Sequence, residues 1–576
     1  MKYLLRYLKR YTKESILAPL FKMLEALFDL FVPIVVAHMI DVGIRNQDKG
    51  YIVGCVLLLV ALALIGLLCS FVAQFFAARA ATGVATRMRH ELFAHIQSLG
   101  SSEVDTIGSS TLITRMTSDV NQVQNGLNLF LRLFLRSPFF VFGAMVMAFT
   151  INVRIALIFV ATIPVLSVII FAIMRWTSPR YKQIQGRLDG VMKVTRENLS
   201  GVRVVRAFGR EEAETERFHQ ANDELVAQQV HVSHISSLMN PLTYVVVNLG
   251  IVAIIWAGAG AVNGGILLSG NIVALVNYMS QILVELVKLA NLIVSISRAS
   301  ASVSRVESVL DTRPAMSFAG KGSGKADSRE AVRFDHVSLT YAGAGEESLT
   351  DLSFCALRGQ TIGIIGGTGS GKSSVVSLIP RFYDATAGEV SIMGMPIRDW
   401  EQTALRSVVG TVMQRAQLFK GTIRSNLLMA NEHATDDELW RALTIAQAAE
   451  FVRSKPGQLD EPVEQGGRNL SGGQRQRLTI ARALVRDPQI LILDDSASAL
   501  DFATDAALRR SLREMDGGAT VFIVSQRTSS IRHADQILVL DDGCLLDCGT
   551  HEELLARCDV YREIHESQFR KEGEQA

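Results

Sequence analysis

The sequence contains few cysteines and carries almost no net charge, and both features narrow the range of possible functions. Its 576 residues include six cysteines at scattered positions. Cys544 and Cys548 lack a second ligand pair, so the pattern favours reduced cytosolic thiols over a zinc site or a disulfide framework. Lysine and arginine total 58 against 56 acidic residues, a formal net charge of +2. No global field therefore points to nucleic acid as a partner.

A cleavable signal peptide is also absent. The opening, MKYLLRYLKRYTKES, carries five basic residues among leucines and tyrosines. No small-residue cleavage site closes a short apolar core. The stretch therefore predicts an interfacial helix before the first membrane span, and its positive charges predict a cytoplasmic N-terminus.

Apolar residues, by contrast, make up 49% of the chain and concentrate in its first 300 residues. Six apolar stretches each exceed the ~20 residues that are needed to cross a bilayer. They cover roughly 15–42, 51–78, 127–150, 154–176, 236–263 and 270–297. We therefore predict an all-α, multi-pass transmembrane domain of six helices over residues 1–310, located in the cell membrane and in contact with its lipids.

The segments between these stretches alternate in length and charge. Those near 43–50, 151–153 and 264–269 are short, whereas those at 79–126 and 177–235 are long, charged and helical in pattern. The charge bias places the long segments in the cytoplasm. The membrane helices are therefore expected to continue well beyond the lipid.

Polar side chains within the spans are candidate substrate contacts, since a central charge costs ~2.5–3.5 kcal/mol on insertion scales. Two pairs have a simpler explanation, because residues three apart on a helix can neutralise each other: Lys22 with Glu25, and Glu285 with Lys288. The candidates are Lys22, Glu25, Asp29, Arg132, Arg136, Asn240, Asn248, Gln281, Glu285 and Lys288.

Residues 311–330 are polar and rich in glycine and serine, which predicts a linker. Beyond it, β-rich runs alternate with helical ones, so residues 331–576 are expected to form an α/β P-loop nucleotide-binding domain. GGTGSGKS, at 366–373, follows an apolar strand and precedes a helix, which is the full phosphate-loop pattern in its required context. An ordinary glycine turn would not explain Lys372.

The phosphate loop predicts ATP and Mg²⁺ as cofactors. Its backbone N–H groups surround the phosphates, Lys372 reaches the outer phosphates, and Ser373 holds Mg²⁺. A second apolar strand, ILILDD at 490–495, ends in Asp494, which is expected to hold Mg²⁺ through water. The nucleotide-binding candidates in the loop are Gly366, Gly367, Thr368, Gly369, Ser370, Gly371, Lys372, Ser373 and Ser374.

The stretch NLSGGQRQRLTIARAL, at 469–484, narrows the family. With it, the chain resembles the ATP-binding cassette (ABC) transporters over nearly its whole length, and six spans before one cassette resemble an exporter half-transporter. The resemblance implies that LSGGQ opens a helix toward ATP held by the opposite subunit, so that a working site needs two cassettes. This signature consists of Leu470, Ser471, Gly472, Gly473 and Gln474.

The same resemblance implies roles for other residues. Tyr341 would stack on adenine, Asp501 would end the loop that follows the second strand, and Gln414 would act in catalysis and join Ser373 and Asp494 at Mg²⁺. EPVEQGG at 461–467 resembles the exporter segment that contacts the transmembrane loops. Segments around 107–115 and 206–213 would be the coupling helices.

Two positions depart from the family pattern, and both would face the same nucleotide. The family usually has glutamate where this chain has Asp495, which is shorter by about 1.5 Å, and ~1 Å of misplacement can cost on the order of 100-fold in rate. It usually has histidine where this chain has Gln526, which cannot carry a proton or positive charge at neutral pH. With an intact signature, this pair resembles the degenerate-site subunit of bacterial heterodimeric multidrug exporters.

These features predict a subunit of an ATP-driven exporter of drugs, lipids or other amphipathic molecules, with a different half-transporter as partner. Its own site would bind ATP and hydrolyse it slowly, while its signature would complete the partner's active site. The alternatives are a homodimer with two weak sites and an ATP-binding regulatory subunit. A non-transport cassette ATPase of DNA repair or translation is disfavoured by the six spans and by the lack of a basic stripe.

Overall fold

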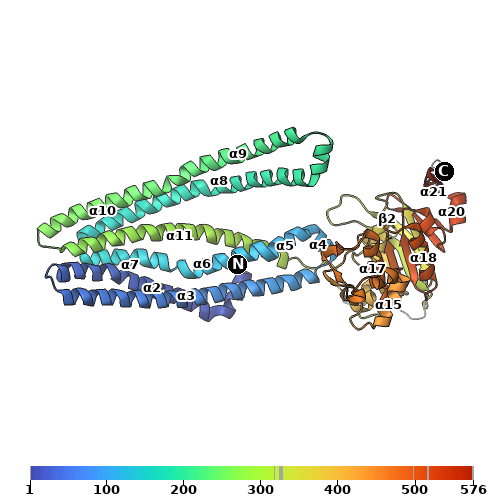
Figure 1. Cartoon of the computed structure of the whole chain (residues 1–576), viewed down its shortest axis with the longest axis horizontal. Coiled ribbons are helices and arrows are strands. Elements are labelled where there is room, and N and C mark those ends of the chain that lie inside the picture. The colour runs from blue at the N-terminus through green and yellow to red at the C-terminus, as the bar shows by residue number, and fades with distance from the viewer. Residues whose placement is uncertain are drawn as a thin grey trace. The chain divides into compact units, whose positions relative to one another are not determined.

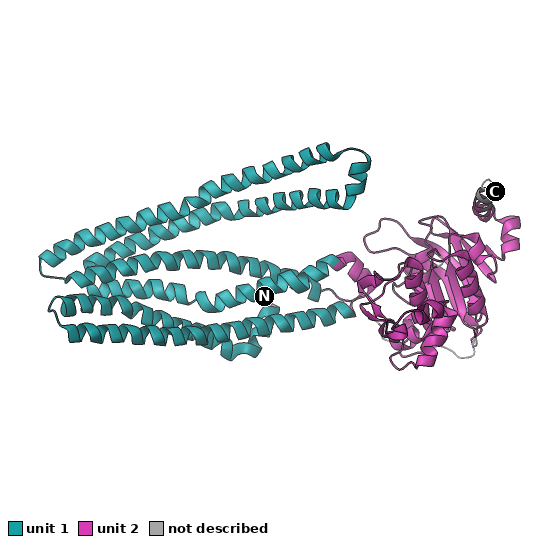
Figure 2. Ribbon diagram, in the orientation of Figure 1, with its two compact units in different colours: residues 1–97, 110–312 teal, residues 98–109, 313–576 magenta. Residues whose placement is uncertain are grey.

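The computed structural model describes residues 2–316, 318, 320–323, 328–496, 498–515 and 518–573. The chain divides into two compact units (Figure 2): unit 1 comprises residues 1–97 and 110–312, and unit 2 comprises residues 98–109 and 313–576. Within the expected linker at 311–330, residues 317, 319 and 324–327 lie outside the described residues.

Unit 2 has the α/β architecture that the sequence predicts. Its strands are β1 (Glu330–Leu339), β2 (Leu349–Leu357), β3 (Thr361–Gly366), β4 (Ala387–Ile392), β5 (Met395–Pro396), β6 (Val409–Val412), β7 (Gly421–Thr422), β8 (Pro462–Val463), β9 (Ile490–Asp494), β10 (Thr520–Val524), β11 (Gln536–Asp541) and β12 (Cys544–Gly549). Its helices are α4 (Ser101–Ile107), α12 (Lys372–Leu378), α13 (Gln402–Val408), α14 (Ile423–Leu428), α15 (Asp436–Ile445), α16 (Ala449–Arg453), α17 (Gly472–Leu484), α18 (Phe502–Arg513), α19 (Thr528–Ile531), α20 (His551–Arg557) and α21 (Asp559–Gly573).

The largest sheet of unit 2 has the strand order β12-β11-β3-β10-β9-β6, and β2-β1-β4-β5 form a smaller antiparallel sheet. Strands β11, β3, β10, β9 and β6 run parallel, while β12 pairs antiparallel at the edge. Side chains of a strand alternate between the two faces of its sheet. Ile490 and Ile492 accordingly join one hydrophobic core with β1, β2 and α12, and Leu491 and Leu493 join another with α14, α15 and α17.

Unit 1 is all helix (Figure 1). Its α-helices are α1 (Lys2–Leu8), α2 (Thr12–His38), α3 (Lys49–Ser98), α5 (Ser109–Thr114), α6 (Val120–Leu133), α7 (Arg136–Ile151), α8 (Val153–Ala207), α9 (Glu211–Ser237), α10 (Met239–Asn263) and α11 (Ser269–Leu310). Among the described residues, six helical segments are long and apolar enough to cross a membrane. The prediction of a six-helix transmembrane domain followed by an α/β cassette is confirmed.

Several of these helices are far longer than a bilayer requires. Helix α3 has 50 residues and α8 has 55. At 1.5 Å per residue they span about 75 and 80 Å, against a hydrocarbon core of about 30 Å. A short connection separates α7 from α8, and in it Asn152 caps α8 by accepting hydrogen bonds from the N–H groups of Arg154 and Ile155. The continuation of the helices beyond the lipid agrees with the expectation from the charged segments.

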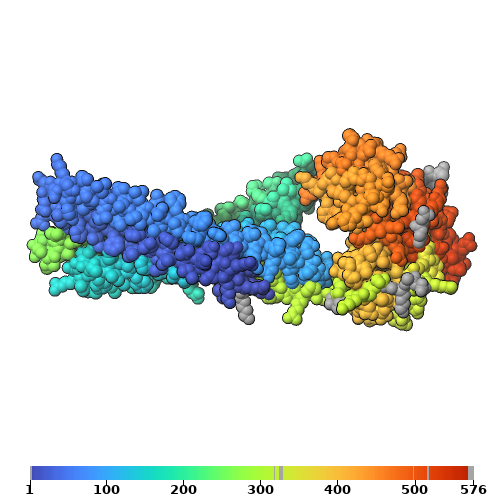
Figure 3. Space-filling view, turned by 90° about the horizontal axis from the view of Figure 1, so that it is seen from below, coloured from blue at the N-terminus to red at the C-terminus, as the bar shows by residue number. Residues whose placement is uncertain are grey.

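The surface of α3 is that of a helix surrounded by lipid. Its outward side chains Leu57, Leu68 and Phe71 are 64%, 66% and 66% exposed. Its buried side is lined by small residues such as Ala73 and Ala77, which let neighbouring helices approach closely. Figure 3 shows this helix in blue along one face of unit 1. Apolar solvent, and not a protein core, therefore covers much of its surface.

Charged side chains inside unit 1 converge on one arginine. Arg136, at the start of α7, donates hydrogen bonds to Glu285 on α11 and to Asp29 on α2, the latter at 3.0 Å. Glu25, also on α2, lies 3.9 Å from the same guanidinium. Ser137 donates to the second oxygen of Glu285 at 2.8 Å. One cation is thus shared by three carboxylates from two other helices.

Two lysines complete this network. Lys22 donates to Glu25 at 2.5 Å and to Ser70 of α3 at 3.1 Å, and Lys288 donates to Glu285 at 2.9 Å. Both pairings at a spacing of three residues are those expected from the sequence. Six of the ten polar candidates therefore form one network with three positive and three negative charges. Mutual neutralisation explains how these helices carry them.

We predict that Glu285→Ala will destabilise unit 1 much more than Lys288→Ala. The first change removes a carboxylate that is 5% exposed and leaves Arg136 undercompensated. Breaking a buried ion pair from one side costs about 3–5 kcal/mol. The second removes a cation that is 44% exposed, and Glu285 keeps Arg136 and Ser137. Thermal unfolding of the detergent-purified assembly measures both. Equal losses would contradict the prediction, and equal losses that are both small would show that the network does not stabilise the helices.

Candidate nucleotide-binding site

The phosphate loop joins the end of β3 to the start of α12. Gly369 and Gly371 adopt φ values of +88° and +89°, a region that side chains with a Cβ rarely occupy. At Gly371 a Cβ would also lie 2.7 Å from Leu349. At Gly366 it would lie 2.1 Å from the carbonyl oxygen of Leu540. These glycines are therefore required by the backbone path and by close packing on β2 and β11.

Lys372 lies along the loop in this structure. Its ammonium donates to the carbonyl oxygens of Gly366, at 3.0 Å, and Gly367, and to the hydroxyl of Ser370 at 3.2 Å. Burial lowers the pKa of Lys372, although the charges of Asp495 and Asp494 oppose this. A buried cation held by neutral carbonyls is poised to move to an anion such as a phosphate group.

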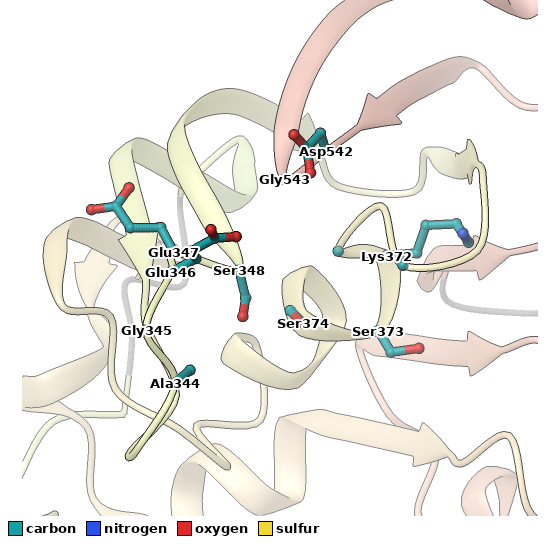
Figure 4. A pocket seen from close by; sticks show the side chains of 12 residues that line it. Ala344, Gly345, Glu346, Glu347, Ser348, Lys372, Ser373, Ser374, Asp542 and Gly543 are labelled. Carbon is teal, nitrogen blue, oxygen red and sulfur yellow. The ribbon is translucent and has the colours of Figure 1, made fainter.

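A cavity of about 680 Å³ lies beside the loop (Figure 4). One side is formed by Lys372, Ser373 and Ser374 at the start of α12, the opposite side by residues 344–348, and Asp542 and Gly543 lie at the edge between these two sides. The N-terminus of α12 opens at its wall, where unpaired backbone N–H groups favour anions. Its size is within the range of small-molecule sites.

Asp494 ends β9 close to the phosphate loop. The hydroxyl of Ser373 donates to its Oδ1 at 3.1 Å. Burial raises the pKa of Asp494, and the charge of Asp495 adds to this, while Ser373 and Lys372 act in the opposite direction. A half-buried carboxylate beside a hydroxyl provides hard oxygen ligands of the kind that Mg²⁺ prefers. The residues present therefore fit such an ion.

Asp495 follows directly and has an unusual backbone. Its φ is +42°, and its N–H donates to the carbonyl oxygen of Val524 at 3.1 Å. Its Oδ2 accepts a hydrogen bond from Nε2 of Gln414 at 3.3 Å. The turn after β9 thus directs two adjacent carboxylates to different partners, Asp494 to Ser373 and Asp495 to Gln414.

Gln526 reaches the same edge of the sheet from β10. In the parallel register Val524 pairs with Ile364 of β3 on one side and Asp494 of β9 on the other. Gln526 is two residues beyond Val524 and is exposed. Because the carboxyl ends of parallel strands meet at one edge, the phosphate loop, both aspartates and Gln526 come together there.

Tyr341 lies beside α12. Its hydroxyl donates to Oγ of Ser374 at 2.9 Å, and its ring meets Tyr383 edge to face with 5.0 Å between centroids. The hydroxyl of Tyr383 donates to Asp105 of α4 at 2.5 Å. Helix α4, within residues 98–109 of unit 2, lies just before the segment at 107–115 that the sequence suggested for coupling. The other expected coupling segment, around 206–213, forms the turn between α8 and α9.

The signature occupies a different part of the domain. Ser471 caps α17: its Oγ accepts from the N–H of Gln474 at 3.2 Å, and Oε1 of Gln474 accepts from the N–H of Ser471 at 3.1 Å. Leu470 anchors it in the core formed with α14 and α15. The cap engages the N–H groups of Ser471 and Gln474, so the N–H groups of Gly472 and Gly473 in the first turn are the ones that this helix start can offer to an anion.

Asp501 caps α18 in a similar way. It accepts hydrogen bonds from the N–H of Thr504, at 2.8 Å, and from the Thr504 hydroxyl at 2.9 Å. These bonds lower the pKa of Asp501 and keep it ionised. A Cβ on Gly473 of the signature would lie 3.1 Å from the carbonyl oxygen of Ala499, so this loop and the signature are close neighbours.

Three further residues lie around this site and belong to none of the sequence motifs described above. Tyr383 contacts Tyr341, the residue expected to stack on adenine. Asp105 accepts a hydrogen bond from Tyr383 and is linked to Tyr341 through it. Gln568 of α21 contacts the backbone of Gln526. Each is far in sequence from its partner, and only the position of Tyr383, in RFYD soon after the phosphate-loop helix, could have suggested a role.

Comparisons with known proteins agree with this arrangement. Residues 15–286 match the family described as "ABC transporter transmembrane region", and residues 349–498 match "ABC transporter". Over 572 residues the chain is 36% identical to an "Uncharacterized ABC transporter ATP-binding protein", YfiB, of Bacillus subtilis (strain 168), with 99% of each chain covered.

A second relative from Bacillus subtilis (strain 168) is the "Probable multidrug resistance ABC transporter ATP-binding/permease protein YheH". It is 32% identical over 491 residues, which cover 85% of this chain and 72% of the relative. A solved structure of a bacterial Atm1-family ABC exporter with ATP bound matches with a TM-score of 0.80 at 24% identity. The match covers 97% of this chain and 98% of the solved chain, and it shows that the two proteins share a fold.

We predict that Tyr383→Ala will weaken ATP binding about three- to tenfold, the equivalent of an aromatic pair at ~0.5–1.5 kcal/mol. The substitution removes the ring that supports Tyr341. Tyr383→Phe is the matched control, because it keeps the ring and loses only the hydrogen bond to Asp105. A fluorescent-nucleotide titration of the purified assembly gives both Kd values. If the two variants bind ATP equally well, the ring does not position Tyr341.

Proposed function

The chain belongs to the ABC transporter family, and we propose that it forms one half of an asymmetric two-chain exporter. A transmembrane domain and an ATP-binding cassette are fused in one polypeptide, as in an exporter half-transporter, and half-transporters of this family dimerise. We place the ATP site of this chain in a nucleotide-retaining role. The signature of this chain then completes the faster site, on the cassette of a different partner.

The separation of the two functional surfaces supports a need for two chains. The helix after the phosphate loop, α12, contributes to the core on one face of the large sheet. The signature helix, α17, contributes to the core on the other face. An ATP molecule on the phosphate loop therefore requires a signature from a second cassette.

Asp495 is the observation on which the asymmetric reading rests. As an aspartate it is about 1.5 Å shorter than glutamate, and ~1 Å of misplacement can cost on the order of 100-fold. Its backbone is already in the left-handed region, and its carboxylate is engaged by Gln414. The short side chain and its hydrogen bond to Gln414 would limit how far the carboxylate extends toward a water molecule at the γ-phosphate. It would polarise that water poorly.

Gln526 adds a second weakness at the same nucleotide. Its amide can donate a hydrogen bond to a phosphate oxygen, but it carries no charge and cannot transfer a proton. A site with both substitutions keeps the means to bind ATP and lacks two groups that promote its cleavage. In contrast, the capped helix start at Ser471 is intact.

The remaining residues then have distinct roles in binding. Tyr341 would leave Ser374 and stack on adenine, and Lys372 would exchange the loop carbonyls for the β- and γ-phosphates. Ser373 and Asp494 would hold Mg²⁺ between them, with Gln414 beside the reacting water and the ion. The bound Mg²⁺ would supply positive charge that neutralises the phosphates.

The partner would receive the other surface of this cassette. The N–H groups at the start of α17 would face the γ-phosphate on the partner's phosphate loop, and Asp501 would border the same contact. Electrostatic stabilisation by aligned backbone donors is the main contribution expected of such a helix start.

The transported molecule is proposed to be an amphipathic drug or lipid. The neutralised charges in unit 1 leave mainly apolar helix surfaces, and one relative carries the name of a multidrug resistance transporter. The basic residues before the first span support an orientation with the N-terminus and the cassette in the cytoplasm.

Two alternatives to the asymmetric exporter are a homodimer and a regulatory subunit. A homodimer would place two copies of Asp495 and Gln526 in one assembly, giving two equally weak sites. A regulatory subunit would bind ATP and support no transport. The intact signature favours the asymmetric exporter, since a regulatory subunit would have no use for a surface that completes another active site.

We predict that Ser471→Arg will nearly abolish ATPase activity of the assembly, while Asp495→Asn will lower it no more than about twofold. The arginine would block the helix start offered to the partner, where loss of one donor to developing charge costs on the order of 10²–10³-fold. The asparagine would remove a carboxylate that is already too short. Asp495→Glu should restore only part of the activity of this site, because Gln526 is unchanged.

Steady-state ATPase assays on the purified two-chain assembly decide between these readings. Equal damage from Asp495→Asn and Ser471→Arg would identify the site of this chain as fully hydrolytic and would overturn the asymmetry.

A further prediction concerns composition. When expressed with its natural neighbours and purified by a tag on this chain, the protein should be recovered in a one-to-one complex with a different half-transporter. Native mass spectrometry gives the subunit masses directly. A homodimer with full transport activity would contradict this proposal and favour two identical sites.

A further inference from the structure

The segment that carries Gln526, residues 525–530, is contacted by two helices, α21 and α18. It runs from Ser525, at the end of β10, into α19, which begins at Thr528. Ser525 and Thr528 are 2% and 0% exposed, whereas Gln526 between them is exposed. Gln526 and the neighbouring Arg527 are therefore the two side chains that this segment offers outward, between residues that are buried on either side.

Helix α21 contacts the first half of this segment chiefly through Gln568. Nε2 of Gln568 donates to the carbonyl oxygen of Gln526 at 2.7 Å. Its Oε1 accepts from the N–H of Thr528 at 2.9 Å and from the Thr528 hydroxyl at 3.0 Å. One amide thus supplies a donor to the Gln526 carbonyl and an acceptor oxygen to both donors of Thr528.

Helix α18 supplies the contacts to the second half. Arg509 donates to the carbonyl oxygen of Ser529 at 2.8 Å, and Ser530 donates to Asp505 at 3.3 Å. Arg509 and Asp505 also pair with each other at 2.7 Å. Because Asp501 caps α18, this helix joins the backbone around Gln526 to the loop that borders the signature.

Helix α21 is itself firmly seated. Tyr561 is fully buried, and its hydroxyl lies 2.7 Å from Nδ1 of His551 at the start of α20. Burial raises the pKa of Tyr561 to about 12, so it remains a neutral hydrogen-bonding group. His565 lies 3.2 Å from the Thr528 hydroxyl through its Nδ1. The helix can therefore hold Gln568 in a defined position.

We propose that Gln568 is a positioning residue for nucleotide at this site: it sets the backbone of Gln526 so that the Gln526 amide meets the γ-phosphate. A hydrogen bond to the Gln526 carbonyl fixes the peptide plane from which that side chain starts. The two bonds to Thr528 fix the other end of the turn. This inference rests on the proposed function, in that Gln526 faces the nucleotide held by Lys372.

The role differs from general support of the domain. A purely structural contact would affect stability alone, whereas positioning through Gln526 requires that the two glutamines depend on each other. If Gln526 is absent, removal of Gln568 should have no further effect on the nucleotide. Dependence of this kind is measured by a double-mutant cycle.

The test uses the purified assembly and measures retention of a photoreactive ATP analogue on this chain after dilution into unlabelled ATP. The variants are Gln526→Ala, Gln568→Ala, the double variant, and Gln568→Glu, which keeps an acceptor oxygen for the two donors of Thr528 and replaces the donor to the Gln526 carbonyl by a second acceptor. Glu566→Ala is the control, an exposed position on the same helix. Thermal unfolding and steady-state kcat and KM are recorded for each.

We expect Gln526→Ala and Gln568→Ala to release the analogue about tenfold faster, the effect of one hydrogen bond to a charged group. The double variant should be no worse than either, and Gln568→Glu should release it at least as fast as Gln568→Ala, because a carboxylate oxygen would then face the Gln526 carbonyl oxygen. Glu566→Ala should match wild type. If the two single effects multiply, or if Gln568→Ala behaves like Glu566→Ala, the proposal is wrong.

This result is separable from the fate of the asymmetric site. Should the site prove hydrolytic, the same dependence between the two glutamines would appear in kcat instead of in retention, with KM little changed. Independence of the two glutamines in both measurements would overturn the positioning role whatever the rate of hydrolysis.

Discussion

The parallel register of β3, β10 and β9 is the constraint on which the nucleotide site depends. These three neighbouring strands end at one edge, where they deliver the phosphate loop, Gln526 and the pair Asp494–Asp495. Parallel strands must be joined by crossover connections, so these residues are distant in sequence although they are adjacent in space. Any shift of one strand by one residue would turn its side chains to the opposite face and separate these groups.

The same sheet divides the cassette into two functional sides. Alternate residues of β9 join different cores, so α12 and α17 are held by opposite faces of one sheet. Helix α12 packs on one core and α17 on the other. In the proposed arrangement, the phosphate loop and the signature of one chain therefore contact different nucleotides. The proposed sharing of each nucleotide between two chains agrees with how the sheet is covered.

Buried charges are compensated to different extents in the two units. In unit 1, Arg136 balances carboxylates from α2 and α11 within the protein. In unit 2, burial raises the pKa of Asp494 and lowers the pKa of Lys372, so neither charge is fully compensated. Balanced charges stabilise a helix bundle, whereas uncompensated ones favour the binding of ligands that carry the opposite charge. The cassette is accordingly suited to phosphates and a cation.

Local patterns in the sequence were sufficient to predict the six long apolar helices, the α/β domain and the phosphate-loop motif, because each is encoded by adjacent residues, whereas the helix at the signature was implied by the family resemblance. The i, i+3 pairs Lys22–Glu25 and Glu285–Lys288 were predictable for the same reason. The convergence of both pairs on Arg136 was not, nor was the support of Gln526 by Gln568 or of Tyr341 by Tyr383. Those contacts join residues on different helices and strands, and only the tertiary packing of these elements brings their donors and acceptors within hydrogen-bonding distance.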